Sequence, residues 1–250
     1  TATITAGNTQ AYTAEAFDQF NNSLGDVTTS TVFSIEAGAG GSWADNVYTS
    51  ASAGTWIVSG DYTGLVDTAS LTVDPASAAS LDLTPDGGSA AAGSPFTVTV
   101  TARDAYGNIA TGYTGNVTFT SSDPGATLPS DYTFVAGDSG AHTFTSGVTL
   151  FTSGNQTVTV TDTVNGTLTD TEIWSVGAEV AATLDLTPNG GTCTAGSALT
   201  VTVTARDTYG NVASGYTGTV HFTSSDTGAI LPADYTFGVS DGGTHTFVDG

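Results

Sequence analysis

One stretch of the 250-residue sequence occurs twice, and this repeat limits the folds that the chain can adopt. Residues 79–147 align with residues 182–250 without a gap, at an offset of 103. The segment Val98-Thr-Val-Thr-Ala-Arg-Asp-Ala-Tyr-Gly-Asn-Ile109 returns as Val201-Thr-Val-Thr-Ala-Arg-Asp-Thr-Tyr-Gly-Asn-Val212. A period of this length is the size of one small domain, so the sequence predicts a tandem array of similar modules.

A fainter third copy lies at the start of the chain, at an offset of 86. Its Ala6-Gly7 pair matches Ala92-Gly93, and residues 12–22 cover the same strand and turn as the repeat. We therefore predict three modules, at residues 1–75, 79–176 and 182–250. The linkers between them are short and rich in small residues, which favours adjacent modules in a rod.

Apolar and polar residues alternate within the second module, as expected for strands that have one face in a core and one in water. The clearest apolar row consists of Phe96, Val98, Val100 and Ala102. Further strands are expected at residues 81–84, 116–121, 132–135, 141–150, 156–162 and 167–174. Short strands separated by Gly, Asn, Asp and Pro predict an all-β fold, with each module an antiparallel β-sandwich.

The first and third modules are expected to be incomplete. The first begins at the equivalent of Gly87 and lacks a strand equivalent to residues 81–84, whereas the third ends at the equivalent of Gly147. We therefore expect a piece of a longer array; a donor strand from a neighbouring chain is the alternative. The single cysteine, Cys193, permits no disulfide within the chain. It is expected to be a small buried residue, with an intermolecular disulfide as the alternative.

The charge balance is strongly acidic, with Lys plus Arg 2 against Asp plus Glu 24 and a formal net charge of −22. Nucleic acids and anionic membrane surfaces bind mainly through Lys and Arg, so both are excluded as partners. No apolar run is long enough to predict direct membrane insertion. The acidic residues either stay solvated and keep the array soluble or bind calcium. The candidate calcium ligands, all in or beside repeated turns, are Asp123, Asp131, Asp138, Asp226, Asp234 and Asp241.

The most specific local motif is Asp-x-Tyr-Gly-Asn, which follows a strand in both copies. Aspartate accepts hydrogen bonds from the backbone of a turn, glycine tolerates a positive φ, and asparagine closes the loop. We therefore predict a structural turn made by Asp104, Gly107, Asn108, Asp207, Gly210 and Asn211. The preceding Arg103 and Arg206 are expected to make a local charge-assisted contact rather than to recognise an acidic partner.

Modules two and three continue from this turn into Val117-Thr-Phe119 and Val220-His-Phe222. In this they resemble the bacterial immunoglobulin-like domains of invasin and intimin type, which carry an Asp-x-x-Gly-Asn turn followed by a Val-x-Phe strand. Module one resembles them loosely, through residues 18–22. The resemblance implies tandem immunoglobulin-like β-sandwiches that form a rigid spacer or adhesive array outside a prokaryotic cell. It does not imply any receptor specificity.

Groups suited to catalysis are scarce. His142 and His245 occupy one repeat position and are expected to be packed histidines. The chain has no Lys, which excludes Schiff-base chemistry, so we predict that the protein is not an enzyme. Candidate N-glycosylation sites are Asn21, Asn116, Asn155 and Asn165.

The sequence therefore predicts a structural or adhesive repeat array of a secreted or cell-surface prokaryotic protein, such as a stalk, surface layer or extracellular filament. The expected partners are neighbouring copies of itself or further repeats, and surface glycans or host receptors. The alternative is a carbohydrate-binding or passive spacer module attached to an extracellular enzyme. Exposed aromatic residues can stack on sugars, and the residues that motivate this alternative are Trp43, Trp56, Trp174, Tyr113 and Tyr216.

Overall fold

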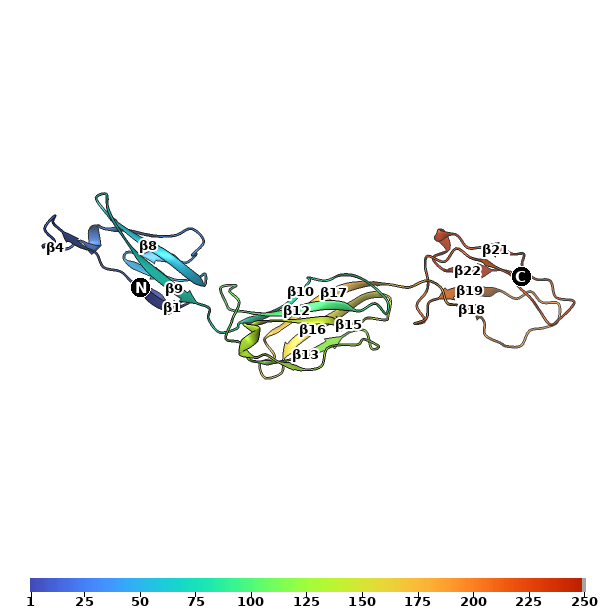
Figure 1. The fold of residues 1–250 in the computed structure, drawn as a ribbon. Helices are drawn as coiled ribbons and strands as arrows, with labels where there is room; N and C mark the ends of the chain where they lie inside the picture. Colours follow the sequence, from blue (N-terminus) through green and yellow to red (C-terminus); the bar gives the residue numbers. More distant parts are fainter. Residues whose placement is uncertain (249–250) are drawn as a thin grey trace.

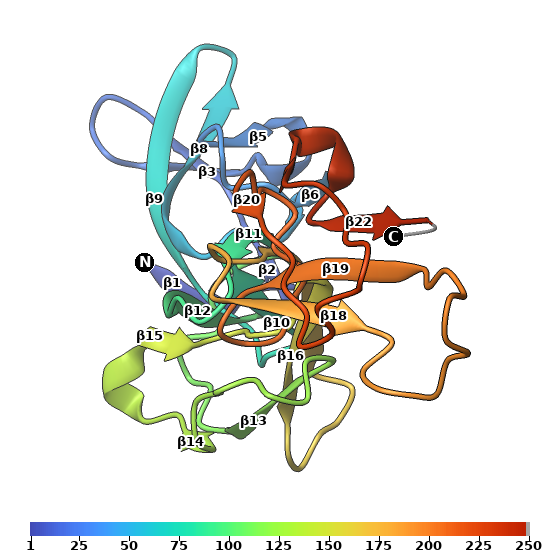
Figure 2. The same cartoon turned by 90° about the vertical axis from the view of Figure 1, so that its right-hand side faces the viewer.

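The computed structural model describes residues 1–248, which form three groups of strands in a row (Figure 1). In the view turned by 90°, the three groups overlap one another (Figure 2). The protein is thus a rod of β-structured modules, as predicted. The helices in the described part are three short 3₁₀ turns, η1 (Thr28–Ser30), η2 (Ala136–Asp138) and η3 (Val239–Asp241). None of these is long and apolar enough to span a membrane.

Module two is a β-sandwich of two facing sheets. The first sheet has the order β10 (Ser80–Thr84), β12 (Phe96–Arg103), β15 (Ala141–Val148). The second has the order β11 (Gly88–Ala91), β17 (Thr169–Gly177), β16 (Gly154–Asp162), β13 (Asn116–Ser121), β14 (Tyr132–Thr133). The first three strands of module two alternate between the sheets, with β10 and β12 in the first and β11 in the second. Its last two strands, β16 and β17, both lie in the second sheet. This is the strand order of an immunoglobulin-like domain.

One strand pair in module two departs from the prediction of a wholly antiparallel sandwich. β11 runs parallel to β17, whereas the remaining pairs of this module are antiparallel. The chain crosses from the first sheet to the second between β10 and β11, so β11 enters beside the last strand in the same direction. β11 was also not predicted, because Gly88-Ser-Ala-Ala91 has no apolar alternation.

The alternation in β12 produces the core of this module. Val98, Val100 and Ala102 are fully buried. The opposite face carries threonines that pair across strands, such as Thr99 with Thr143, whose hydroxyl oxygens are 2.9 Å apart. Such cross-strand pairs stabilise a sheet, which accounts for the abundance of Thr.

Modules one and three have smaller buried cores than module two. Module one has a sheet of β1 (Ala2–Thr5), β9 (Leu65–Asp74), β8 (Gly54–Tyr62) and β5 (Val32–Ile35). It also has β2 (Thr9–Ala11), β7 (Val47–Thr49) and β6 (Ser42–Ala44), and the hairpin of β3 (Glu15–Phe17) and β4 (Ser23–Asp26). Module three has β18 (Thr183–Thr187), β19 (Val201–Arg206) and β22 (Thr244–Phe247), with the pair β20 (Thr219–Val220) and β21 (Tyr235–Thr236).

Two local predictions are wrong for physical reasons. The strand expected at residues 132–135 ends at Thr133, because Phe134 turns into the core and Asp138 accepts the N–H of Val135 at 2.7 Å. Cys193, expected to be buried, is exposed. Its equivalent in module two is Ala90 of β11, which lies beside β17. Within residues 1–248, no strand equivalent to β17 lies beside Cys193.

Candidate functional site at the module junctions

The structure places the predicted turn residues in two closely similar turns. Asp104 Oδ1 accepts the backbone N–H groups of Tyr106 and Asn108, each at 2.9 Å. Asn108 Nδ2 donates to Asp104 Oδ2 at 2.9 Å, and Gly107 has a φ of +85°. The turn of Asp207, Tyr209, Gly210 and Asn211 has the same hydrogen bonds. Each turn is therefore held by an aspartate that is almost completely buried.

The turn of module two also binds module one. Asn108 Oδ1 accepts the backbone N–H of Ala53, and Asn108 Nδ2 donates to the carbonyl of Ala51, both at 2.8 Å. The linker is held as well, because Ala76 donates its backbone N–H to Asp104 Oδ2 at 2.9 Å. We call this set of three bonds the junction clamp. It ties the turn of one module to a loop of the preceding module and to the linker.

The same clamp recurs between modules two and three. Asn211 Oδ1 accepts the N–H of Ser153 at 2.8 Å, and Asn211 Nδ2 donates to the carbonyl of Phe151 at 2.7 Å. Glu179 of the linker donates its N–H to Asp207 Oδ2 at 3.1 Å. Two consecutive junctions therefore use equivalent atoms, which gives them equivalent geometry.

An aromatic ring lies against a glycine in each junction. A Cβ atom added to Gly7 would be 2.1 Å from Tyr106 Oη, and one added to Gly93 would be 1.9 Å from Tyr209 Oη. Both glycines have a positive φ, +88° and +76° respectively. Only glycine combines this backbone conformation with such a close approach. The Ala-Gly match between the repeats was visible in the sequence, but its place in the junction was not.

Two opposing effects set the charge of the clamp aspartates. Burial raises the pKa of Asp104, but the hydrogen bonds from Asn108, Ala76 and Tyr106 outweigh it and lower the pKa below its ordinary value. For Asp207, burial likewise raises the pKa, and the bonds from Asn211, Glu179 and Tyr209 lower it further than burial raises it. Donors that converge on a carboxylate favour its charged form. The clamp is therefore charged at neutral pH.

Because the pKa of Asp104 is lowered in the folded state, module two is expected to lose stability in acid. A carboxylate with a depressed folded-state pKa stabilises the protein above its unfolded pKa of about 4 and loses that contribution as the pH falls through the folded pKa. We expect the melting temperature of module two to be nearly constant from pH 7 to 5 and to fall below about pH 4. Calorimetry at pH 7 and pH 3 should show a smaller fall for Asp104→Asn than for the wild-type chain. Equal falls in both chains would contradict this role of Asp104.

The two arginines make the local contacts predicted for them. Arg103 Nε lies 2.6 Å from Asp82 Oδ2, and its Nη1 donates to the carbonyl of Gly107 at 3.2 Å. Arg206 makes the same contacts with Asp185 and Gly210. Each arginine therefore braces the clamp turn of its own module from the outer face.

The candidate calcium ligands do not come together. Asp123 is buried and binds the N–H groups of Phe151 and Thr152. Asp138 and Asp241 bind a tyrosine and a histidine, and Asp234 binds His221. Asp131 and Asp226 are exposed. No group of three His, Cys, Asp or Glu residues that could hold a metal lies within residues 1–248, and calcium binding stays a prediction.

The histidines are packed against aromatic rings. His142 stacks on Tyr132 with ring centroids 3.8 Å apart, and His245 stacks on Tyr235 at 3.9 Å. Their Nδ1 atoms lie 3.0 Å from Asp138 and 3.1 Å from Asp241, respectively. The contact between His142 and Asp138 thus joins β15 to η2, and that between His245 and Asp241 joins β22 to η3. This supports a role in holding the loop rather than in chemistry.

The aromatic residues considered for sugar binding lie mostly within the modules. Trp174 is buried, and Trp43 and Trp56 pack against the core of module one. Tyr113 packs on Phe134 and donates to Asp162 at 2.5 Å, and Tyr216 packs on Phe237. Among the sequon asparagines, Asn21, Asn155 and Asn165 are exposed, whereas Asn116 is partly buried and donates to Thr133.

No family model and no curated protein matches the sequence. Among solved structures, the chain is similar to domains 4 and 5 of the S-layer protein SbsC, with 26% identity over 70% of this chain and 91% of that one and a TM-score of 0.31. The Escherichia coli adhesin FdeC has 19% identity over 97% of this chain and 83% of its own, with a TM-score of 0.47. Invasin, described as a bacterial integrin-binding protein, has 17% identity over 87% of this chain and 47% of its own, with a TM-score of 0.38. These TM-scores are below 0.5, so the immunoglobulin-like assignment rests on the strand order of module two.

Proposed function

We propose that this chain is a stiff structural or adhesive repeat array of a secreted or cell-surface prokaryotic protein. The observation that carries the proposal is the junction clamp, which occurs twice with the same atoms. Domains joined by a short linker alone are expected to move relative to one another. Here the asparagine, the aspartate and the linker N–H restrain that movement at each junction. Modules that are held in the same way at every junction form a straight, stiff array. Such an array suits a stalk, a surface layer or a filament.

The proposed partners are further modules of the same kind. Module one carries the clamp turn in the same conformation, because Asp18 Oδ1 accepts the N–H groups of Phe20 and Asn22, each at 2.9 Å. Asn21 takes the left-handed conformation that Gly107 has in module two, with a φ of +65°. Phe20 is 75% exposed, against 49% for the equivalent Tyr106. The turn is therefore preformed to receive a loop like that of residues 51–53 or 151–153. Surface glycans and host receptors stay further proposals.

Spin-label distances test the stiffness directly. One label is placed on the exposed Cys193 of module three, and the other on a cysteine introduced at Val164 of module two, which is 91% exposed. We expect a narrow distance distribution for the wild-type junction and a clearly broader one for Asn211→Ala, because this change removes two bonds of the clamp. The measurement is double electron-electron resonance.

Asn22→Ala is the matched control for this experiment. It removes the same side chain from the same type of turn, but at a place where residues 1–248 provide no docked module. We expect its distance distribution to equal that of the wild-type chain. A broad distribution in the wild-type protein, or one that Asn211→Ala leaves unchanged, would contradict the proposed stiff array.

A further inference from the structure

The loop between β16 and β17 of module two carries the sequon Asn165-Gly166-Thr167. Residues 163–167 are all exposed, and Val164 is 91% exposed. A Cβ atom added to Gly166 would have nothing within 4 Å apart from its own chain neighbours. The sequon therefore lies at an open surface, where an enzyme and a bulky sugar can reach it.

The base of this loop is held firmly by the module. Asp162 Oδ1 accepts the backbone N–H groups of Val164 and Asn165, at 2.8 and 2.9 Å. Leu168, which is buried, donates its N–H to the carbonyl of Asn165 at 2.9 Å. These bonds fix the main chain of Asn165, so its side chain is presented outward in one defined place.

The amide and the hydroxyl of this sequon face each other. Thr167 donates its hydroxyl to Asn165 Oδ1 at 2.7 Å and its backbone N–H to the same atom at 3.3 Å. Within residues 1–248, Asn165 Nδ2 donates to no acceptor. N-glycosylation attaches a sugar to this nitrogen and requires a hydroxyl two residues further on. Both groups are thus together in an accessible loop, with the nitrogen available.

The other two sequons of module two lie within strands. Asn116 of β13 donates Nδ2 to Thr133 Oγ1 at 2.8 Å, so its nitrogen is already engaged. Asn155 begins a sequon in β16, and its Thr157 pairs with β17 on one side and accepts the N–H of Ser122 on the other. A segment paired on both sides cannot enter an enzyme active site unless its ladder hydrogen bonds break.

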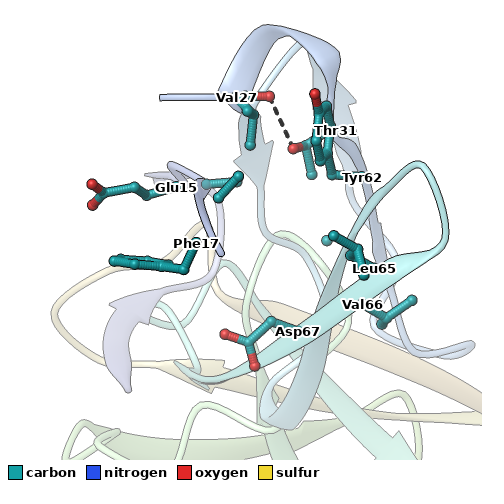
Figure 3. A pocket seen from close by; sticks show the side chains of 11 residues that line it. Glu15, Phe17, Val27, Thr31, Tyr62, Leu65, Val66 and Asp67 are labelled. Atoms are coloured by element: carbon teal, nitrogen blue, oxygen red, sulfur yellow. Dashed lines mark hydrogen bonds between the residues drawn. The ribbon is translucent and has the colours of Figure 1, made fainter. Parts of the chain in front are cut away.

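The sequon of module one has its hydroxyl engaged elsewhere. Asn21 lies in the tight turn after β3, with a φ of +65°. The third residue of its sequon, Ser23, donates its hydroxyl to the carboxylate of Glu15. Figure 3 shows that the Glu15 side chain points away from Leu65 and Val66, toward the outside of the module. The hydroxyl of Ser23 therefore contacts this carboxylate instead of the Asn21 amide.

We propose that Asn165 is N-glycosylated in the folded protein and that the fold excludes the other three sequons. In this reaction Asn165 Nδ2 attacks the anomeric carbon of an oligosaccharide carried on a polyprenyl phosphate or diphosphate. A C–N bond forms as the C–O bond to the phosphate breaks, the lipid phosphate leaves with the electron pair, and one amide proton is released. The proposal rests on the proposed secreted or cell-surface location, because such donors are used outside the cytoplasm.

Glycan transfer to the purified, folded chain tests this selectivity. The probe is a polyprenyl-linked oligosaccharide with a single-subunit oligosaccharyltransferase that modifies the free peptide of residues 161–169. Mass spectrometry of proteolytic fragments measures the occupancy of each sequon. We expect Asn165 to be modified at least about tenfold faster than Asn116 or Asn155, because those two must first open locally.

Free peptides provide the matched control. The three sequons of module two all have Thr in the third position, so their isolated peptides are expected to be modified at similar rates. In the folded chain, Thr167→Ala should abolish the modification of Asn165, and Thr167→Ser should keep it. A bare Asn165 in the folded chain overturns the proposal, as does equal modification of Asn116 and Asn155.

The chain isolated from its own source provides the second measurement. The fragment that contains Asn165 is expected to carry a glycan, and an unmodified fragment would overturn the proposal. Asn165 takes no part in either junction clamp, so Asn165→Gln should leave the spin-label distance between modules two and three unchanged. Failure of the glycosylation proposal and failure of the stiff array are therefore measured separately.

Discussion

Replacement of Val100 by aspartate is expected to unfold module two while module one stays folded. Val100 is fully buried in the centre of β12, between Leu83 of β10 and His142 of β15. A buried carboxylate without a partner costs several kcal/mol, which is comparable with the whole stability of a module of this size, about 5 to 15 kcal/mol. Differential scanning calorimetry should show that the transition of module two is lost and that of module one is kept.

Thr120→Asp is the control for this experiment. Thr120 is exposed on β13 of the same module, next to the buried Phe119, so it adds the same charge at a solvated place. Its melting profile is expected to match the wild-type profile closely. If Val100→Asp removed all transitions together, the modules would not be independent folding units.

Asp123→Ala is expected to produce the second-largest loss of stability. Asp123 is 3% exposed and accepts the N–H groups of Phe151, Thr152 and Gly125, at 2.6, 3.0 and 3.0 Å. Burial raises the pKa of Asp123, but the bonds from Thr152, Phe151 and Gly125 lower it further, so the group is charged at neutral pH. Loss of this acceptor leaves buried donors unpaired, at a cost of about 3 kcal/mol. The melting temperature of module two should fall by about 12 to 24 °C.

Module three provides a matched control for Asp123. Asp226 occupies the same repeat position but is exposed, and its Oδ1 accepts the N–H of Gly228 at 2.9 Å. Among the described residues, no donors equivalent to Phe151 and Thr152 bind the Asp226 carboxylate. We therefore expect Asp226→Ala to change the melting temperature of its module by no more than about 2 °C. Equal losses from both substitutions would show that the bonds to Phe151 and Thr152 are not what makes Asp123 important.

The sequence predicted the fold well where one local pattern decides the structure. The alternation in β12 and the Gly-rich and Asn-rich turns were sufficient for an all-β sandwich, because side-chain direction alternates along a strand. The sequence did not predict β11, because its small residues show no alternation and its pairing partner, β17, lies 86 residues further along the chain. Such a contact is set by the topology of the whole module.

The repeated aspartates show why the candidate site could be predicted only in part. Asp104 and Asp123 are each followed within three residues by a glycine, yet one holds the linker and the other holds a distant loop. A turn motif identifies a carboxylate that accepts backbone N–H groups, but it does not identify which segment supplies them. The binding of Asn108 to Ala51 joins residues 57 positions apart and belonging to different modules. No single repeat contains that information.

The composition of the junction clamp affects how such an array can change over time. The loop that receives the asparagine contributes main-chain atoms, so Ala51 in one module and Phe151 in the next are held equally well. The side chains at these positions are free to diverge while the joint keeps its shape. A gene that gains, loses or exchanges whole modules would then still encode correctly jointed neighbours. The length of the protein and the surface properties of each module can therefore vary independently of the joints.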